Sequence, residues 1–128
     1  MIGLDTREGE RSLMQTGFGW IEVGKKTYPH DIIIHTDGSV SKRKKKVSKG
    51  MKGDYGHTPL SEFELGFLSD EKPEVVYIGT GQFGSLPLTP EAREILSSFI
   101  TVLLPTSEII RVIEDEKRSF VALLHITC

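Results

Sequence analysis

The chain has 128 residues, of which 38% are hydrophobic and 27% are charged, and its formal net charge at pH 7 is −2. These values are typical of a soluble globular protein, and the length suffices for a single domain, residues 1–128, without disulfide or metal support. No apolar run approaches the roughly 20 residues needed to cross a bilayer, which excludes an integral membrane protein.

The charge is unevenly distributed. Seven of the sixteen basic residues lie between Lys42 and Lys52 with no acidic residue among them. We interpret residues 42–53 first as a solvated basic loop, because charge runs are usually solvated. Steering of an acidic protein partner is a second interpretation. Nucleic-acid binding is the less favoured alternative because no aromatic residue lies between the lysines to stack on a base.

The first elements along the chain are β-strands. Residues 1–14 are expected to be mobile; they lack the apolar segment of a secretory signal and the acid-poor composition of a transit peptide. Alternating residues 18–23 and the isoleucine-rich residues 31–35 predict a hairpin interrupted by Gly24-Lys25-Lys26. The turn pair Asp37-Gly38 then predicts a further short strand from Ser39. We therefore expect an N-terminal antiparallel β element.

Helices and buried strands alternate in the rest of the chain. Thr58-Pro59 and Thr89-Pro90 each predict a helix start, with threonine as N-cap and proline in the first turn. Thr106 or Ser107 is expected to cap a third helix. Apolar runs with β-branched residues predict strands at 75–78, 100–104 and 120–126, the last in the middle of the sheet. The fold class is α/β: a single domain with a central, mixed, mostly parallel sheet of about five strands flanked by helices.

The most informative motif is the glycine loop, which we define as Gly79, Thr80, Gly81, Gln82, Phe83 and Gly84. It reads G-x-G-x-x-G directly after a predicted strand. A dinucleotide site is disfavoured because the next helix begins only at Thr89-Pro90 and no acidic residue ends the following strand. Two interpretations stay open: a tight turn that requires glycine, and a small anion or polar ligand cradled by the N–H groups of residues 80–84.

Other polar residues give weaker indications. In an extended strand His125 and Thr127 share one face and Cys128 lies on the other, so local geometry sets up no cysteine–histidine pair. His125 is expected to be a hydrogen-bonded core residue. His57, or Asp54, could meet a ligand beside the predicted helix start. Histidine spacing predicts no metal site, and we assign no cofactor or catalytic residue. The single cysteine suggests a reducing compartment, which we take to be the cytoplasm.

Several of these motifs together resemble a known family. They are Asp31 to His35 with Asp37 to Val40, then Tyr55 to His57, Ile78 to Gly81, and the ending His125 to Cys128. The family contains small single-domain proteins of unknown biochemical function, including the mammalian adipogenesis-associated domain protein and a mitochondrial complex I assembly factor. The ending H-x-T-C is similar to that of its archaeal and bacterial branch. The resemblance covers residues 18–128 and implies a compact α/β domain without an established reaction.

The functional hypothesis follows from the glycine loop. We expect a non-catalytic binding or assembly module that contacts a protein partner through residues 79–84, with Gln82 as a polar anchor and Phe83 as an apolar one. The alternative is a small-molecule-binding protein or an enzyme with a pocket at the same loop, in which His57 or Asp54 transfers protons. An exposed apolar patch would favour the first and a deep pocket the second.

Overall fold

The computed structural model describes residues 14–128 and contains two sheets. The segment expected to be mobile, 1–14, lies outside the described residues except for Met14, which is buried. The smaller sheet is antiparallel and has the order β1-β2-β3 (Gln15–Gly17, Trp20–Val23 and Lys26–Tyr28). The larger sheet has the order β5-β4-β8-β6-β7 (Val40–Lys42, Ile32–Ile34, Phe120–His125, Val75–Thr80 and Ile100–Leu104).

The larger sheet is mixed, as predicted. β8 lies in its middle, parallel to β6 on one side and antiparallel to β4 on the other. β6 is also parallel to β7, and β5 is antiparallel to β4. β6 and β8 are buried at every residue, which explains why most of each strand, residues 75–78 and 120–124, is a continuous apolar run in the sequence.

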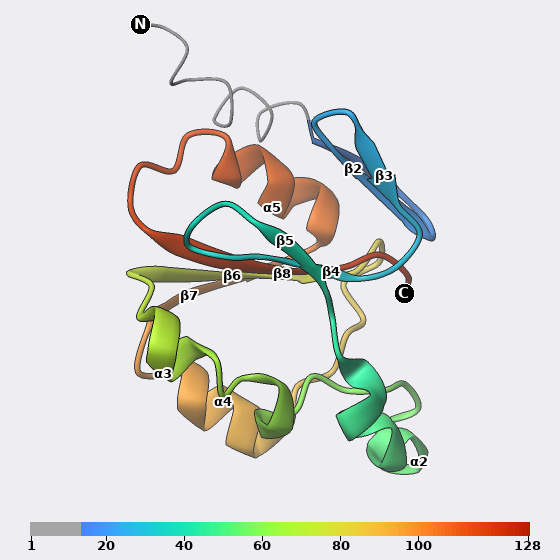
Figure 1. Ribbon diagram of the computed structural model, residues 1–128. Coiled ribbons are helices and arrows are strands. Elements are labelled where there is room, and N and C mark those ends of the chain that lie inside the picture. Colours follow the sequence, from blue (N-terminus) through green and yellow to red (C-terminus); the bar gives the residue numbers. More distant parts are fainter. Residues whose placement is uncertain (1–13) are drawn as a thin grey trace, which may run out of the picture.

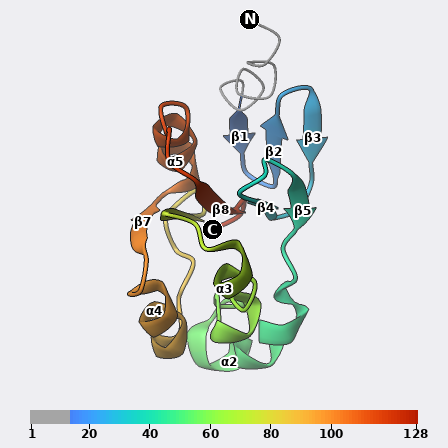
Figure 2. The ribbon, with the colours of Figure 1, turned by 60° about the vertical axis from the view of Figure 1, so that its left-hand side comes forward.

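Two layers cover the sheet (Figure 1). One face carries α5 (Thr106–Ile113) and the small sheet, and its core includes Val75, Tyr77 and Ile109. The other carries η3 (Glu62–Glu64), α3 (Leu68–Glu71) and α4 (Pro90–Leu96), packed on Val76 and Ile78 among others. Figure 2 shows α5 and the small sheet on the same side of the large sheet. No helix within residues 14–128 is long and apolar enough to span a bilayer.

The predicted hairpin between residues 18–23 and 31–35 is wrong. β2 pairs instead with β1 and β3, and the two segments lie in different sheets. Val23 pairs with Lys26, so Gly24 (φ +62°) and Lys25 form a tight two-residue turn. The strand after this turn, β3, is polar and partly exposed, so it carried no apolar alternation.

The helix predicted from Thr58-Pro59 is also wrong. Leu60 is extended and forms a β-bridge with Leu88. Its N–H donates to the Pro87 carbonyl at 2.9 Å, and the Thr89 N–H donates to its carbonyl at 3.0 Å. Only η3 and α3 follow before β6. Tertiary pairing of Leu60 therefore overrides the local helix signal.

The corresponding prediction for α4 is confirmed: the Thr89 side chain accepts from the Ala92 N–H, with Pro90 in the first turn. In α5, by contrast, Pro105 is the N-cap and no side chain caps the helix. Thr106 is the first helical residue, and its hydroxyl is used elsewhere.

The basic segment, expected as a loop over 42–53, folds into η2 (Lys45–Met51) and α2 (Lys52–Tyr55). Ser48 fixes it to the domain because its buried hydroxyl lies 2.6 Å from Ser61 Oγ and donates to Glu64 at 2.7 Å. The lysines of the segment are exposed, whereas Arg43 is buried.

Candidate functional site

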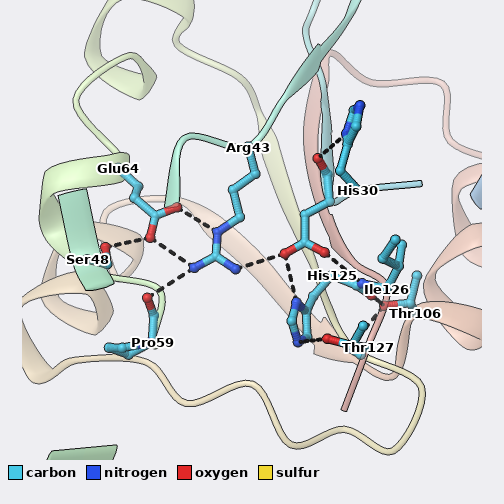
Figure 3. A network of polar contacts seen from close by, with 11 residues as sticks. His30, Arg43, Ser48, Pro59, Glu64, Thr106, His125, Ile126 and Thr127 are labelled. Carbon is cyan, nitrogen blue, oxygen red and sulfur yellow. Dashed lines mark hydrogen bonds and ion pairs between the residues drawn. The ribbon is translucent and has the colours of Figure 1, made fainter. Parts of the chain in front are cut away.

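Unlike the exposed lysines of the basic segment, Arg43 is buried and belongs to a polar network (Figure 3). Its Nε and Nη2 donate to the two carboxylate oxygens of Glu64, at 2.7 and 2.9 Å. Nη1 donates to Asp31 Oδ2 at 2.9 Å, and Nη2 also donates to the Pro59 carbonyl at 3.0 Å. Burial would lower the pKa of Arg43, but the bond and charge of Glu64, with Asp31, raise it, so the guanidinium stays charged.

Asp31 joins this arginine to residues 125–126. Its carboxylate lies 2.7 Å from His125 Nδ1 and accepts from the Ile126 N–H at 2.9 Å. Burial would raise the pKa of Asp31, but the hydrogen bond and charge of His125, with the Ile126 N–H and Arg43, lower it to about 2. The prediction that His125 is a hydrogen-bonded core residue is confirmed.

The glycine loop begins within β6, whose last two residues are Gly79 and Thr80, and two of its glycines are required by close packing. A Cβ at Gly79 would lie 2.7 Å from Thr106 Oγ1. A Cβ at Gly81 would lie 2.3 Å from the Thr127 carbonyl oxygen, and the φ of Gly81, +104°, already disfavours any other residue. The loop and residues 125–128 are therefore packed main chain against main chain.

Three consecutive main-chain donors of the loop, those of residues 81–83, already have protein acceptors. The Gly81 N–H donates to Thr106 Oγ1 at 3.0 Å, and the Gln82 N–H donates to the Thr127 oxygen at 3.0 Å. The Phe83 N–H donates to the main-chain oxygen of Cys128, also at 3.0 Å. The amides of residues 81–83 are therefore not free to cradle an anion, which was one of the two interpretations above. The tight-turn interpretation describes what the glycines do.

The tip of the loop is open to solvent. The Phe83 side chain is 77% exposed, and its ring centroid lies 6.2 Å from that of Phe18, which is 62% exposed. Gln82 is half-buried and its Nε2 donates to Thr16 Oγ1 on β1 at 3.1 Å. Of the other loop residues, Gly79, Thr80 and Gly81 are buried and Gly84 is exposed. The loop, with its backbone fixed at several points, thus presents Phe83 beside Phe18 of the β1–β2 turn.

His57 meets Cys128, a pairing that the sequence analysis missed. His57 Nδ1 lies 3.3 Å from Cys128 Sγ, beside a hollow of about 130 Å³ that is also lined by Lys45, Lys52 and Thr127. The Phe83 N–H donates to the main-chain oxygen of Cys128, and Cys128 also lines the hollow. The hollow therefore lies next to the glycine loop. Within residues 14–128 no cluster of three or more histidine, cysteine or acidic side chains is placed to hold a metal ion.

The network of Asp31, Arg43 and Glu64 was not predicted. Arg43 was expected among the solvated basic residues, because no local pattern distinguishes this arginine from the lysines around it. The arginine fork, able to bind two carboxylates at once, is the one chemical difference that could have singled it out.

Fold and site together define a small α/β domain in which a mixed five-stranded sheet and a three-stranded sheet support an exposed loop beside a basic hollow. Two solved structures share this fold at substantial sequence identity. The conserved hypothetical protein PH1505 from Pyrococcus horikoshii OT3 is 30% identical with a TM-score of 0.79, over 89% of this chain and 97% of that one. MT938 is 33% identical with a TM-score of 0.71, over 89% and 96%. The chain belongs to the family of MT938 and PH1505.

A third structure supports the fold alone. It is a Bordetella pertussis protein described as a Mth938-like domain, and it is 23% identical with a TM-score of 0.52, over 89% of this chain and 86% of that one. No protein-family model matches the chain, and the comparison with curated proteins also finds no match. None of the three structural relatives carries a function in its description, so function is argued from the site.

Proposed function

We propose that this protein is a binding or assembly module with a non-catalytic contact surface, formed by Phe83 at the tip of the glycine loop and Phe18 in the β1–β2 turn. The observation that carries the proposal is the exposure of two neighbouring aromatic side chains: Phe83, 77% exposed on a loop whose amides are fixed by residues 127–128, and Phe18, 62% exposed in the β1–β2 turn. Aromatic anchors on a rigid backbone lose little entropy on binding, which is why they dominate protein interfaces.

The positive charge beside the loop favours a partner whose binding site is bordered by acidic residues. Lys45 and Lys52 line the hollow that adjoins the loop through Cys128, and both belong to the basic segment. An apolar anchor next to several exposed ammonium groups fits a partner surface with a hydrophobic pocket bordered by carboxylates. Such a surface steers association, so the association rate should fall as salt is added.

The resemblance described above favours the same class of function, because the eukaryotic assembly factor of that family acts by binding partner proteins. We place the protein and its partner in the cytoplasm, in keeping with its single cysteine, Cys128. The respiratory role of the eukaryotic protein is not part of the proposal.

Site-specific photocrosslinking tests the proposal. A benzophenone amino acid is placed at position 83 in cells, and in a matched chain at position 100. Ile100 is the control because it is also exposed and apolar but begins β7, at the end of the sheet opposite the loop. We expect one discrete protein to crosslink from position 83 and not from position 100.

The partner identified in this way is then purified and its affinity measured. Phe83→Ala should weaken binding at least roughly tenfold, as expected for an interface hot spot, and Ile100→Ala should leave it unchanged. Equal crosslinking from both positions, or an affinity insensitive to Phe83→Ala, would refute the proposed surface.

The hollow beside His57 favours a second candidate function, binding of a small anion. Two lysines, one arginine and two histidines are among the residues that line this hollow of about 130 Å³, and this volume suits an ion rather than a large metabolite. Titration with inorganic phosphate, followed by amide NMR shifts at His57 and Cys128, tests it. Saturable shifts that disappear in Lys45→Ala/Lys52→Ala but persist in Lys25→Ala, an exposed lysine of the β2–β3 turn, would support this function. Flat titration curves would exclude it.

A further inference from the structure

The β4–β5 hairpin places a serine and a histidine on one face of the sheet. Ser41 on β5 lies opposite Ile33 on β4, and His35 follows two residues after Ile33. Residues two apart on a strand share a face, so His35 and Ser41 are diagonal neighbours. Ser41 Oγ lies 2.7 Å from His35 Nε2, and Ser41 is exposed to solvent.

Glu71, the last residue of α3, holds the other nitrogen of the same ring. Its Oε2 lies 2.5 Å from His35 Nδ1. Its Oε1 accepts from the Thr36 N–H at 3.0 Å and from the Thr36 hydroxyl at 3.2 Å. A carboxylate accepts only, so His35 Nδ1 carries the hydrogen of this bond and Nε2 can accept the Ser41 hydroxyl proton. Phe67 packs edge-on against the ring, with centroids 5.5 Å apart.

An apolar groove opens beside Ser41. A cavity of about 490 Å³ is lined by His35 and Ser41 together with the apolar side chains of Val47, Phe63 and Phe67. Phe63 is 62% exposed and Val47 is 55% exposed, so the groove presents hydrocarbon to solvent. His35 also lines a smaller hollow of about 330 Å³, together with polar residues that include Thr36 and Asp37. The larger, apolar groove beside Ser41 suits an apolar acyl chain.

The open edge of the sheet carries a main-chain donor next to Ser41 in the chain. β5 is an edge strand, and the Arg43 N–H donates to the Asp31 carbonyl at 3.0 Å. Hydrogen-bonded pairs alternate in an antiparallel ladder, so the N–H of Lys42, the residue after Ser41, points toward the open edge. Lys42 and Lys44 also line the groove and place positive charge beside it.

We propose that Ser41 and His35 are catalytic residues for the hydrolysis of carboxylic esters with an apolar acyl group, and that Glu71 is their positioning residue. Ser41 Oγ attacks the ester carbonyl while His35 Nε2 takes its proton. The carbonyl–alkoxy bond then breaks, and the alcohol leaves with that proton. Water attacks the acyl-serine, gives a proton to His35, and releases the carboxylic acid as the proton returns to Ser41.

This activity is independent of the partner-binding surface. Ile34, beside His35, pairs with Ala122, whereas the loop contacts residues 127–128, beyond the other end of β8. A variant at Ser41 should therefore leave partner crosslinking from position 83 unchanged, and Phe83→Ala should leave ester hydrolysis unchanged.

Steady-state hydrolysis of p-nitrophenyl acetate, butyrate and hexanoate by the full chain is the first test. Ser41→Ala should lower kcat/KM at least roughly 100-fold, while Ser98→Ala, an exposed serine after α4, should have no effect. Glu71→Gln should lower kcat with KM unchanged, and Glu71→Asp should recover part of it. Phe63→Ala should raise KM for the hexanoate ester and not for the acetate.

Labelling gives a readout that does not depend on the choice of ester. A fluorophosphonate probe forms a bond between phosphorus and the attacking serine oxygen and releases fluoride, so intact mass and peptide mapping should place one adduct on Ser41. Absence of that adduct from folded wild-type protein would overturn the proposal. So would a Ser41→Ala variant that hydrolyses the esters at the wild-type rate, or loss of hydrolysis in Cys128→Ser instead.

Discussion

Replacement of Asp31 by asparagine tests whether the buried network stabilises this fold. The Asp31 carboxylate contacts three groups from distant parts of the chain: Arg43 Nη1, His125 Nδ1 and the Ile126 N–H. These contacts lower its pKa from 3.8 to about 2, which at about 1.4 kcal/mol per pKa unit corresponds to about 2 kcal/mol of stability at neutral pH.

The Asp31→Asn variant loses the stability that the carboxylate contributes. It also leaves the buried Arg43 with only Glu64 to balance its charge. Removal of one partner of a buried ion pair typically costs about 3–5 kcal/mol. Glu64 retains both of its bonds to Arg43, so we expect a loss near the lower limit, about 3 kcal/mol. Asp54→Asn, at an exposed carboxylate of α2, is the matched control and should change stability by less than about 0.5 kcal/mol.

Urea unfolding followed by circular dichroism measures the free energy of unfolding of each variant at pH 7. The pH dependence adds a second signature. Because the folded pKa of Asp31 is depressed, its contribution is present above about pH 4 and is lost as the pH falls toward about 2. Wild-type protein should lose stability over this range more steeply than Asp31→Asn. A variant as stable as wild type at pH 7, or one with the same acid dependence, would refute the reasoning.

Three further substitutions have calculable effects on the free energy of unfolding, measured in the same way. Gly81→Ala should cost more than about 3 kcal/mol, because its Cβ would lie 2.3 Å from the Thr127 oxygen; a milder effect would show that the loop can move away. Thr106→Val should cost about 2–3 kcal/mol, because its buried hydroxyl accepts from the Gly81 N–H and donates to the His125 carbonyl, whereas Thr106→Ser should cost less than half as much. Thr89→Ala should cost about 1 kcal/mol through loss of the α4 cap.

The central strands could be predicted because burial on both faces leaves a direct trace in the sequence. β6 is apolar over residues 75–78 and β8 over residues 120–124, and α4 carries a complete Thr-Pro start signal that the fold uses. The strands β1 and β3 could not be predicted, since they are short and largely polar and are held by main-chain pairing. The same local signal failed at Thr58-Pro59 because Leu60 pairs with Leu88.

In the candidate site, the sequence predicted the positions that need glycine but not the residues that pack against them. The glycines marked where the chain bends after β6, but the residues that close the loop, Thr127 and Cys128, lie far further along the chain. Asp31 meets His125 across 94 positions, and His57 meets Cys128 across 71. Pairs at such separations depend on the order of strands in the sheet, which no spacing rule encodes.

Residues 125–128 connect the buried network to the glycine loop. His125 contacts Asp31 through its ring, and its carbonyl accepts from Thr106, whose hydroxyl also holds Gly81. The Ile126 N–H donates to Asp31, and the next two residues accept from the loop amides. Loss of the Asp31 carboxylate should therefore loosen the loop before the domain unfolds, with faster hydrogen exchange at the Gln82 and Phe83 amides than at β6. The rigidity that makes Phe83 a good anchor thus depends on a charge buried on the far side of His125.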